Sequence, residues 1–274
     1  MPGVQRVVVS LAEDFLEGDS LFRVSVDLPA ADEAQIREVV TRIDARMGRF
    51  SGVREREVDA LVGSGARVSA GKEFEVEPFL AAVRNVRQYT ASEPSGSISW
   101  VLRATPSISI SDAPRGTAEP LAAIRAMIGP AAAAEVSIRT TERRHWNVEL
   151  PLPAEREDEL RRRLPETRWN ADFVVVRAGR IAQLTLHGTE PGPVDPDLDF
   201  SRLAYIVRTL DPTGALPLRL DWTWFSAAAG DKRNEGSVHV GGCDYTVPTV
   251  APESLSAEAL GVQTRMRQEF DACP

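Results

Sequence analysis

The N-terminal part of the chain shows two patterns of apolar positions in succession. Apolar residues take every second position at Phe22, Val24, Val26 and Leu28. This alternation over residues 21–28 is typical of a strand with one buried face, and an apolar run at 4–11 predicts a partner strand. From Ile36 to Met47 the apolar residues recur at helical spacing, which predicts a helix directly after the hairpin.

The same order of patterns returns with a constant offset of 124 residues. The alternating strand recurs at Trp146, Val148, Leu150 and Leu152. The helical stripe of Phe79, Ala82, Val83 and Val86 recurs as Leu203, Ile206, Val207 and Leu210, and Trp100 falls on Trp224. A constant offset across strands and helices indicates an internal duplication. The predicted halves are 1–131 and 132–274, with the boundary in an alanine-rich stretch.

Each half is predicted to contain a hairpin, a helix, a second hairpin, another helix, one or two strands and a closing helix. The clearest hairpin turns at Ala178-Gly179, between apolar runs on either side. Helices and strands in this mixed order predict an α+β fold. We expect two related ferredoxin-like-type halves in a pseudo-two-fold arrangement. Each half would be a mainly antiparallel sheet with helices packed on one face.

Charge and cysteine content restrict the classes of function. The net charge is −8, which argues against nucleic-acid binding and is compatible with a basic protein partner. The two cysteines, Cys243 and Cys273, do not make a disulfide framework. The N-terminal residues do not resemble a signal peptide, and no apolar run approaches the ~18 residues of a membrane span. The expected location is therefore the cytoplasm, without membrane contact.

Motifs for nucleotide or metal chemistry are incomplete. Residues 63–73 look like a P-loop, but five residues separate Gly65 from Gly71 where the motif needs four, so a hairpin loop is predicted. The histidines His145, His187 and His239 do not have metal-ligand spacing. The alternating Asp195, Asp197 and Asp199 suggest a calcium loop, but Ile206 stands where glutamate is needed. We interpret them as the acidic start of a helix, and predict no metal, no cofactor and no catalytic residues.

The candidate binding residues are an acidic loop and a pair of tryptophans. These partner-binding candidates are Glu190, Asp195, Asp197, Asp199, Trp222 and Trp224. Trp222 and Trp224 are two residues apart and lie on one face of a predicted strand, where tryptophan serves either as an interface anchor or as a core residue. Both interpretations stay open from the sequence.

Residues 79–100 and 203–224, each a helix followed by a tryptophan-bearing strand, resemble parts of small bacterial immunity proteins. That resemblance implies sequestration of a toxin partner, and no individual residue is carried over from it. The leading hypothesis is a non-catalytic protein-binding module, such as an immunity or inhibitor protein for a basic partner. One alternative is an enzyme or small-molecule binder with a site between the halves, for which His187, His239 and the acidic loop are candidates. The other is a structural or assembly subunit.

Overall fold

The computed structural model describes residues 3–14, 19–47, 55–71, 75–92, 96–114, 116–164, 169–189, 194–224, 232–242 and 252–271. The chain divides into two compact units, Met1–Glu142 (unit 1) and Arg143–Pro274 (unit 2). The described residues form twelve strands and six α-helices, so the chain is a mixed α+β protein as predicted. The predicted division after residue 131 and the internal duplication stay predictions.

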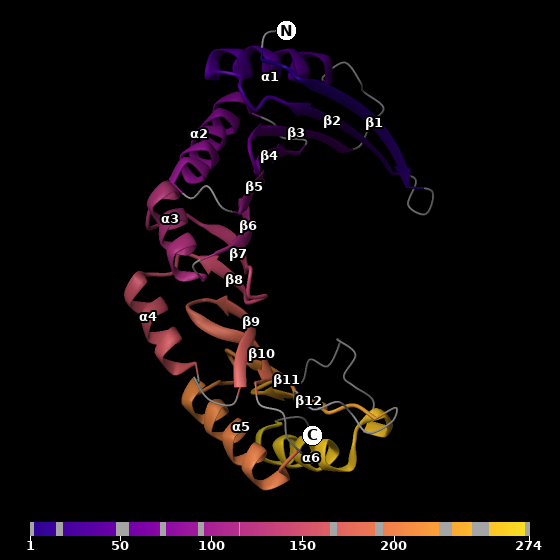
Figure 1. The fold of residues 1–274 in the computed structure, drawn as a ribbon, viewed down its shortest axis with the longest axis vertical. Helices are drawn as coiled ribbons and strands as arrows, with labels where there is room; N and C mark the ends of the chain where they lie inside the picture. Colours follow the sequence, from indigo (N-terminus) through magenta and orange to yellow (C-terminus); the bar gives the residue numbers. More distant parts are fainter. Residues whose placement is uncertain are drawn as a thin grey trace. The chain divides into compact units, whose positions relative to one another are not determined.

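Unit 1 consists of hairpins that alternate with helices. Its elements are β1 (Arg6–Asp14), β2 (Asp19–Asp27), α1 (Glu33–Met47), β3 (Glu55–Gly63), β4 (Ala66–Ala70), α2 (Val76–Ser92), β5 (Ser97–Leu102), β6 (Ser107–Ala113), α3 (Ala118–Ile128) and β7 (Ala134–Thr140). Strands that are consecutive in sequence are neighbours in the sheet. Figure 1 shows α1, α2 and α3 on one face of this sheet.

Unit 2 follows the same plan. Its elements are β8 (His145–Leu150), α4 (Ala154–Arg163), β9 (Trp169–Arg177), β10 (Arg180–Gly188), α5 (Pro196–Leu210), β11 (Leu218–Thr223), β12 (Glu235–Val240), a short 3₁₀ turn (Pro252–Ser254) and α6 (Ala257–Phe270). The strands again lie in sequence order. The helices α4 and α5 cover one face of the sheet (Figure 1), and α6 packs beside β12, where Gln263 accepts a hydrogen bond from the backbone N–H of Ser237 at 2.9 Å.

The strand order corrects the predicted ferredoxin-like halves. Hairpin strands such as β3 and β4 pair antiparallel, whereas strands joined by a helix, such as β2 and β3 or β10 and β11, pair parallel. In a ferredoxin-like fold another strand lies between the two strands that a helix connects. Here each helix returns the chain to the strand beside the one it left, so neither unit has the ferredoxin-like order. The pseudo-two-fold arrangement stays a prediction.

The offset of 124 residues joins elements of the same type and order. It pairs β2 with β8, α1 with α4, α2 with α5, and Trp100 of β5 with Trp224, the residue after β11. The predicted hairpin at Ala178-Gly179 is confirmed, as is the hairpin at Gly65, which replaces the apparent P-loop. The hydrophobic pattern therefore identified the elements correctly, although it did not give the pairing of the strands.

The core of unit 1 lies between the sheet and its helices. Val24 and Val26 of β2 are buried, as are Ile36 and Val40 of α1. Arg87 of α2 donates hydrogen bonds to the carbonyl oxygens of Val62 at 2.7 Å and Leu28 at 3.2 Å. These two hydrogen bonds connect the C-terminal ends of β2 and β3 to α2. Burial lowers the pKa of Arg87.

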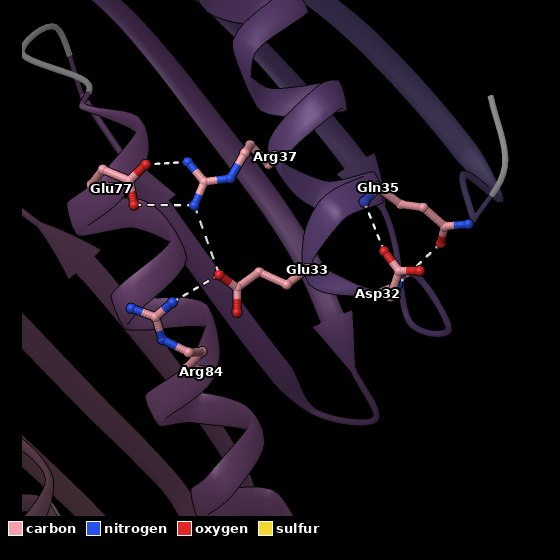
Figure 2. A network of polar contacts seen from close by, with 6 residues as sticks. All are labelled: Asp32, Glu33, Gln35, Arg37, Glu77 and Arg84. Atoms are coloured by element: carbon pink, nitrogen blue, oxygen red, sulfur yellow. Dashed lines mark hydrogen bonds and ion pairs between the residues drawn. The ribbon is translucent and has the colours of Figure 1, made fainter.

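A charged network connects α1 to α2 (Figure 2). Arg37 binds both carboxylate oxygens of Glu77, the longer hydrogen bond being 3.1 Å. Glu33 lies 3.8 Å from Arg37, one turn further along α1, and accepts a hydrogen bond from Arg84 at 2.8 Å. The hydrogen bond from Arg37 lowers the pKa of Glu77. These exposed pairs orient the two helices and contribute little free energy of folding.

None of the described helices combines the length and apolar character needed to cross a membrane.

Candidate functional site

The helix-free face of the unit-2 sheet brings together residues that are far apart in sequence. We use this name for the face that carries the cross-strand row Asn147, Val175, Gln183, Arg219 and His239, as the strand registers define it. The opposite face carries the buried row Trp146, Val174, Leu184, Leu220 and Val238 beneath the helices. One face of the sheet therefore builds the core, and the other presents polar side chains.

A pocket of about 380 Å³ lies at one end of this face. Its polar lining comes from Arg177, Arg180, Gln183, Arg219 and His239. Its apolar lining comes from Val175, Ile181, Ala182, Leu216, Pro217 and Leu218. We call it the arginine pocket, because three guanidinium groups line it and none of the lining residues in the described chain is acidic.

The ion pairs of the pocket leave positive charge available. Arg219 donates from Nε to Asp221 at 2.8 Å, and Gln183 donates to the same carboxylate oxygen at 3.3 Å. Arg180 donates to the carbonyl oxygen of Asp211 at 3.3 Å, which leaves its charge uncompensated. Arg177 is exposed and forms no ion pair within the described residues. The pocket is therefore electropositive in a chain whose net charge is −8.

Two local features of the backbone shape the pocket. The register passes from Ile181–Val176 to Gln183–Val175, so Ala182 is an extra residue, a β-bulge, in β10. Bulges bend a strand and re-aim its side chains, and they are frequent beside functional sites. Here the bulge lets Ile181 be buried, with 7% of it exposed, while Gln183, two residues later, lies on the helix-free face.

The other wall is a loop fixed by close backbone packing. Thr213 and Leu216 exchange backbone hydrogen bonds of 3.1 and 2.9 Å. Gly241 has φ of 77°, and a Cβ there would lie 2.7 Å from the carbonyl oxygen of Thr213. A Cβ on Gly242 would lie 3.1 Å from Cβ of Pro217. The two glycines after β12 thus allow residues 213–217 to pack against the strand end and hold Pro217 at the pocket.

The two candidate tryptophans lie in the core of unit 2. Trp222 is 1% exposed and Trp224 is 3% exposed, and their ring centroids are 6.4 Å apart. Trp169, which is fully buried, lies 5.7 Å from Trp224 in an edge-to-face arrangement. The strand alternation correctly put Trp222 and Trp224 on one face, and that face is the one covered by helices. The core interpretation therefore describes them, and neither indole reaches the surface.

The acidic residues gather at the start of α5. Asp195 is the N-cap residue and accepts hydrogen bonds from the backbone N–H groups of Asp197 and Leu198. Asp199 is completely buried, and its Oδ2 accepts the indole N–H of Trp224 at 2.7 Å. The side chain of Asp197 is 93% exposed and pairs with Arg265 at 2.6 Å. Glu190 lies outside the described residues.

Metal-binding geometry is not found in the part of the chain that the structure describes, where no three His, Asp or Glu side chains form a suitable group. His239 lies in the arginine pocket, whereas His187 of β10 lies opposite Asn170 of β9. A second bulge places Asp172 outside the register of β9. Burial raises the pKa of Asp172, against the opposite effects of His187 and Arg144. The cysteines Cys243 and Cys273 lie outside the described residues.

Sequence reasoning missed the arginines of the pocket. Arg177 and Arg180 flank the predicted turn at Ala178-Gly179, and Arg219 alternates with buried leucines in β11. The signal available in the sequence was the presence of two arginines beside one predicted turn and a third in a predicted strand. They converge because β10 and β11 pair parallel, with Gln183 opposite Arg219. The sheet is mainly antiparallel as predicted, but the sequence did not show which neighbouring strands pair parallel.

Comparison of the chain with protein families, with curated proteins and with solved structures found no match in any of the three.

Proposed function

We propose that this chain is a non-catalytic protein-binding module, and that an acidic segment of its partner docks on the helix-free face of unit 2 at the arginine pocket. The observation that carries the proposal is the convergence of Arg177, Arg180 and Arg219 on one pocket without an acidic lining residue. In a chain with a net charge of −8, this is a local reversal of the overall charge.

Charge complementarity decides the kind of partner. An arginine guanidinium matches a carboxylate through two parallel hydrogen bonds, and arginine is enriched in the energetically important centres of interfaces. Asp221 pairs with Nε of Arg219 and partly compensates its charge. Arg177 and Arg180 have no carboxylate at ion-pair distance within the described residues. These two side chains therefore favour aspartate or glutamate from the partner. A toxin-sequestering or inhibitory role, which the resemblance implies, is the form of protein binding that we propose.

The test compares two doubly charge-reversed variants that have the same net charge. The first variant carries Arg177→Glu and Arg180→Glu in the pocket. The control carries Arg46→Glu and Arg103→Glu, two exposed positions in unit 1. A tagged full chain captures its partner from native lysate, and the purified partner is then titrated against each variant.

The proposal predicts that the control binds like the natural chain, and that the pocket variant binds at least about tenfold more weakly, with a flatter salt dependence. Equal affinity of the two variants would show that the partner binds elsewhere. Thermal unfolding of both variants controls for loss of fold. If the captured partner is a toxin or an enzyme, its activity should fall on addition of the natural chain and not on addition of the pocket variant.

A basic partner is a second candidate, supported by the 93% exposure of the Asp197 side chain at the start of α5. In this case Asp197→Arg should weaken binding, because it replaces the exposed carboxylate by a positive charge that repels a basic partner. An unchanged affinity of this variant for a basic partner would exclude the site.

A further inference from the structure

We infer that the arginine pocket is a site for an amphipathic organic anion, one whose carboxylate or phosphate group faces the arginines and whose apolar body lies against the rest of the lining. This inference deepens the proposed function, since it rests on the same pocket and names the chemical group recognised there. The ligand is either a side chain of the partner or a free small molecule of the same chemistry.

The size of the pocket argues for more than a single inorganic ion. Its volume is about 380 Å³. Sites for small organic ligands typically measure about 300–1,000 Å³, whereas one water molecule takes about 30 Å³ of liquid. An isolated phosphate or carboxylate would leave most of the pocket to water. The pocket therefore has room for an oxyanion together with an attached apolar body.

Positive charge reaches the pocket from two sides. Arg177 and Arg180 flank the turn between β9 and β10, while Arg219 lies in β11, opposite His239 of β12. Gln183 lies between the two groups in the strand register and adds an amide. An oxyanion between these groups receives donors from both sides, an arrangement that suits the several acceptor oxygens of a carboxylate or phosphate.

The remaining lining is apolar. Leu216 and Pro217 come from the loop before β11, and Val175 and Ile181 come from the β9–β10 hairpin. Ligand sites are typically lined mostly by apolar side chains, with a few polar groups that fix orientation. The apolar lining therefore favours a ligand with a hydrocarbon or aromatic body over a fully hydrated anion.

The walls are fixed before any ligand arrives. The bulge at Ala182 is held between paired residues on both sides, and the loop is held by the mutual hydrogen bonds of Thr213 and Leu216. Gly241 and Gly242 allow that loop to pack directly on the end of β12. A preformed pocket binds with less loss of conformational entropy, because its groups are already ordered.

Calorimetric titration of the full chain tests the inference with four probes. Phenyl phosphate and benzoate carry both the anionic group and the apolar body. Inorganic phosphate carries the charge alone, and benzyl alcohol carries the apolar body alone. We expect phenyl phosphate or benzoate to bind, and to bind at least about tenfold more tightly than either half-probe. Binding of phenyl phosphate and benzoate no tighter than that of benzyl alcohol overturns the inference.

Two neutralised variants locate the site. Arg177→Gln removes an exposed charge, and Arg219→Gln removes the charge beside Asp221. Both should weaken the amphipathic anions at least about tenfold, while Arg103→Gln in unit 1 should not change their affinity. Equal affinity in all three variants would place the binding elsewhere and overturn the inference. Arg177→Gln keeps the test valid even if Arg219→Gln disturbs the fold.

Competition with the captured partner separates the two sources of the anion. Displacement of the partner by phenyl phosphate supports a partner side chain as the natural ligand. Probe binding without displacement, together with capture that does not depend on the arginines, supports a free organic anion and rejects the proposed docking site. Capture that depends on the arginines without binding of any amphipathic probe overturns the inference and leaves the proposed function standing.

Discussion

The indole N–H of Trp224 donates a 2.7 Å hydrogen bond to the carboxylate of Asp199, and both side chains are almost completely buried. The same oxygen of Asp199 also accepts the backbone N–H of Asp195 at 3.1 Å. Asp199 therefore links the start of α5 to the tryptophan core of unit 2. Its role is to hold the fold, and the acidic sequence 195–199 is not a uniform binding surface.

Asp199→Ala should destabilise unit 2 by about 2 kcal/mol or more, because it leaves the buried indole N–H of Trp224 without its acceptor and also removes the acceptor of the Asp195 backbone N–H. Asp197→Ala, at the exposed position of the same helix, should change the free energy of unfolding by no more than about 1 kcal/mol. Urea unfolding followed by tryptophan fluorescence measures both. Equal losses in the two variants would contradict the structural role of Asp199. A variant with charge reversal at Asp195, Asp197 and Asp199 together would not separate a loss of binding from a loss of folding, because Asp199 is buried.

Gly236→Ala should disturb the packing of Trp222. A Cβ at residue 236 would lie 2.4 Å from the Trp222 ring, which faces it across β11 and β12. Overpacking of this kind typically costs about 1–3 kcal/mol. The matched control is Gly261→Ala in α6, where a Cβ meets nothing within 4 Å and helix propensity predicts a gain of up to about 1 kcal/mol. A neutral Gly236→Ala, with an unchanged near-UV spectrum, would contradict this packing.

Asp172→Asn should change how stability depends on pH. Burial raises the folded-state pKa of Asp172 above its unfolded value, so the folded chain binds more protons between these two values. Stability from this group is therefore present below the unfolded pKa and is lost as pH rises through the folded pKa. The variant lacks that loss, so its stability relative to the natural chain should rise with pH across the window. Parallel pH profiles from chemical unfolding would refute the assignment.

Glu77→Gln should show the opposite pH dependence. The hydrogen bond from Arg37 lowers the folded-state pKa of Glu77, so its contribution is present above the unfolded pKa and lost as pH falls through the folded pKa. The natural chain should be slightly more stable than the variant at neutral pH, and the difference should vanish in acid and shrink in salt. The side chains of Arg37 and Glu77 are both exposed, so the difference in stability is small. A difference that persists in acid would point to another cause.

The local elements were predictable because their signals are local. The turn of the β9–β10 hairpin needs two residues with positive φ, and Ala178 at 47° and Gly179 at 68° supply them. The helix α1 was equally predictable, because its apolar residues from Ile36 to Met47 recur at helical spacing. Parallel pairing was not predictable, because an alternating strand has the same pattern beside a parallel or an antiparallel neighbour. The location of the pocket depends on this pairing.

Burial was the other quantity that sequence spacing could not supply. Glu157 and Arg161 have the i,i+4 spacing of a solvated pair, but Glu157 is only 2% exposed and Arg161 lies 4.0 Å above the ring of Trp146. Trp222 and Trp224 share a face in sequence and in structure, and the position of the helices decides that this face is the core. Spacing predicts which side chains share a face, whereas tertiary packing decides which face is covered.

Exposed apolar side chains on another strand offer a competing location for a partner. Val7 and Val9 of β1, at the edge of the unit-1 sheet, are 54% and 58% exposed. Edge strands with exposed apolar residues are potential pairing sites for other chains. Val9→Lys should leave partner binding unchanged if the partner docks at the arginine pocket. A loss of binding in affinity measurements on this variant would favour β1 instead.

Hydrogen–deuterium exchange of the full chain, with and without its captured partner, shows directly which segments the partner covers. We predict that slowed exchange concentrates in the β9–β10 hairpin around residues 175–183 and in the loop and strand at 213–219, the segments that build the arginine pocket. Slowed exchange in β1 or at the start of α5, with no change in these pocket segments, would contradict it.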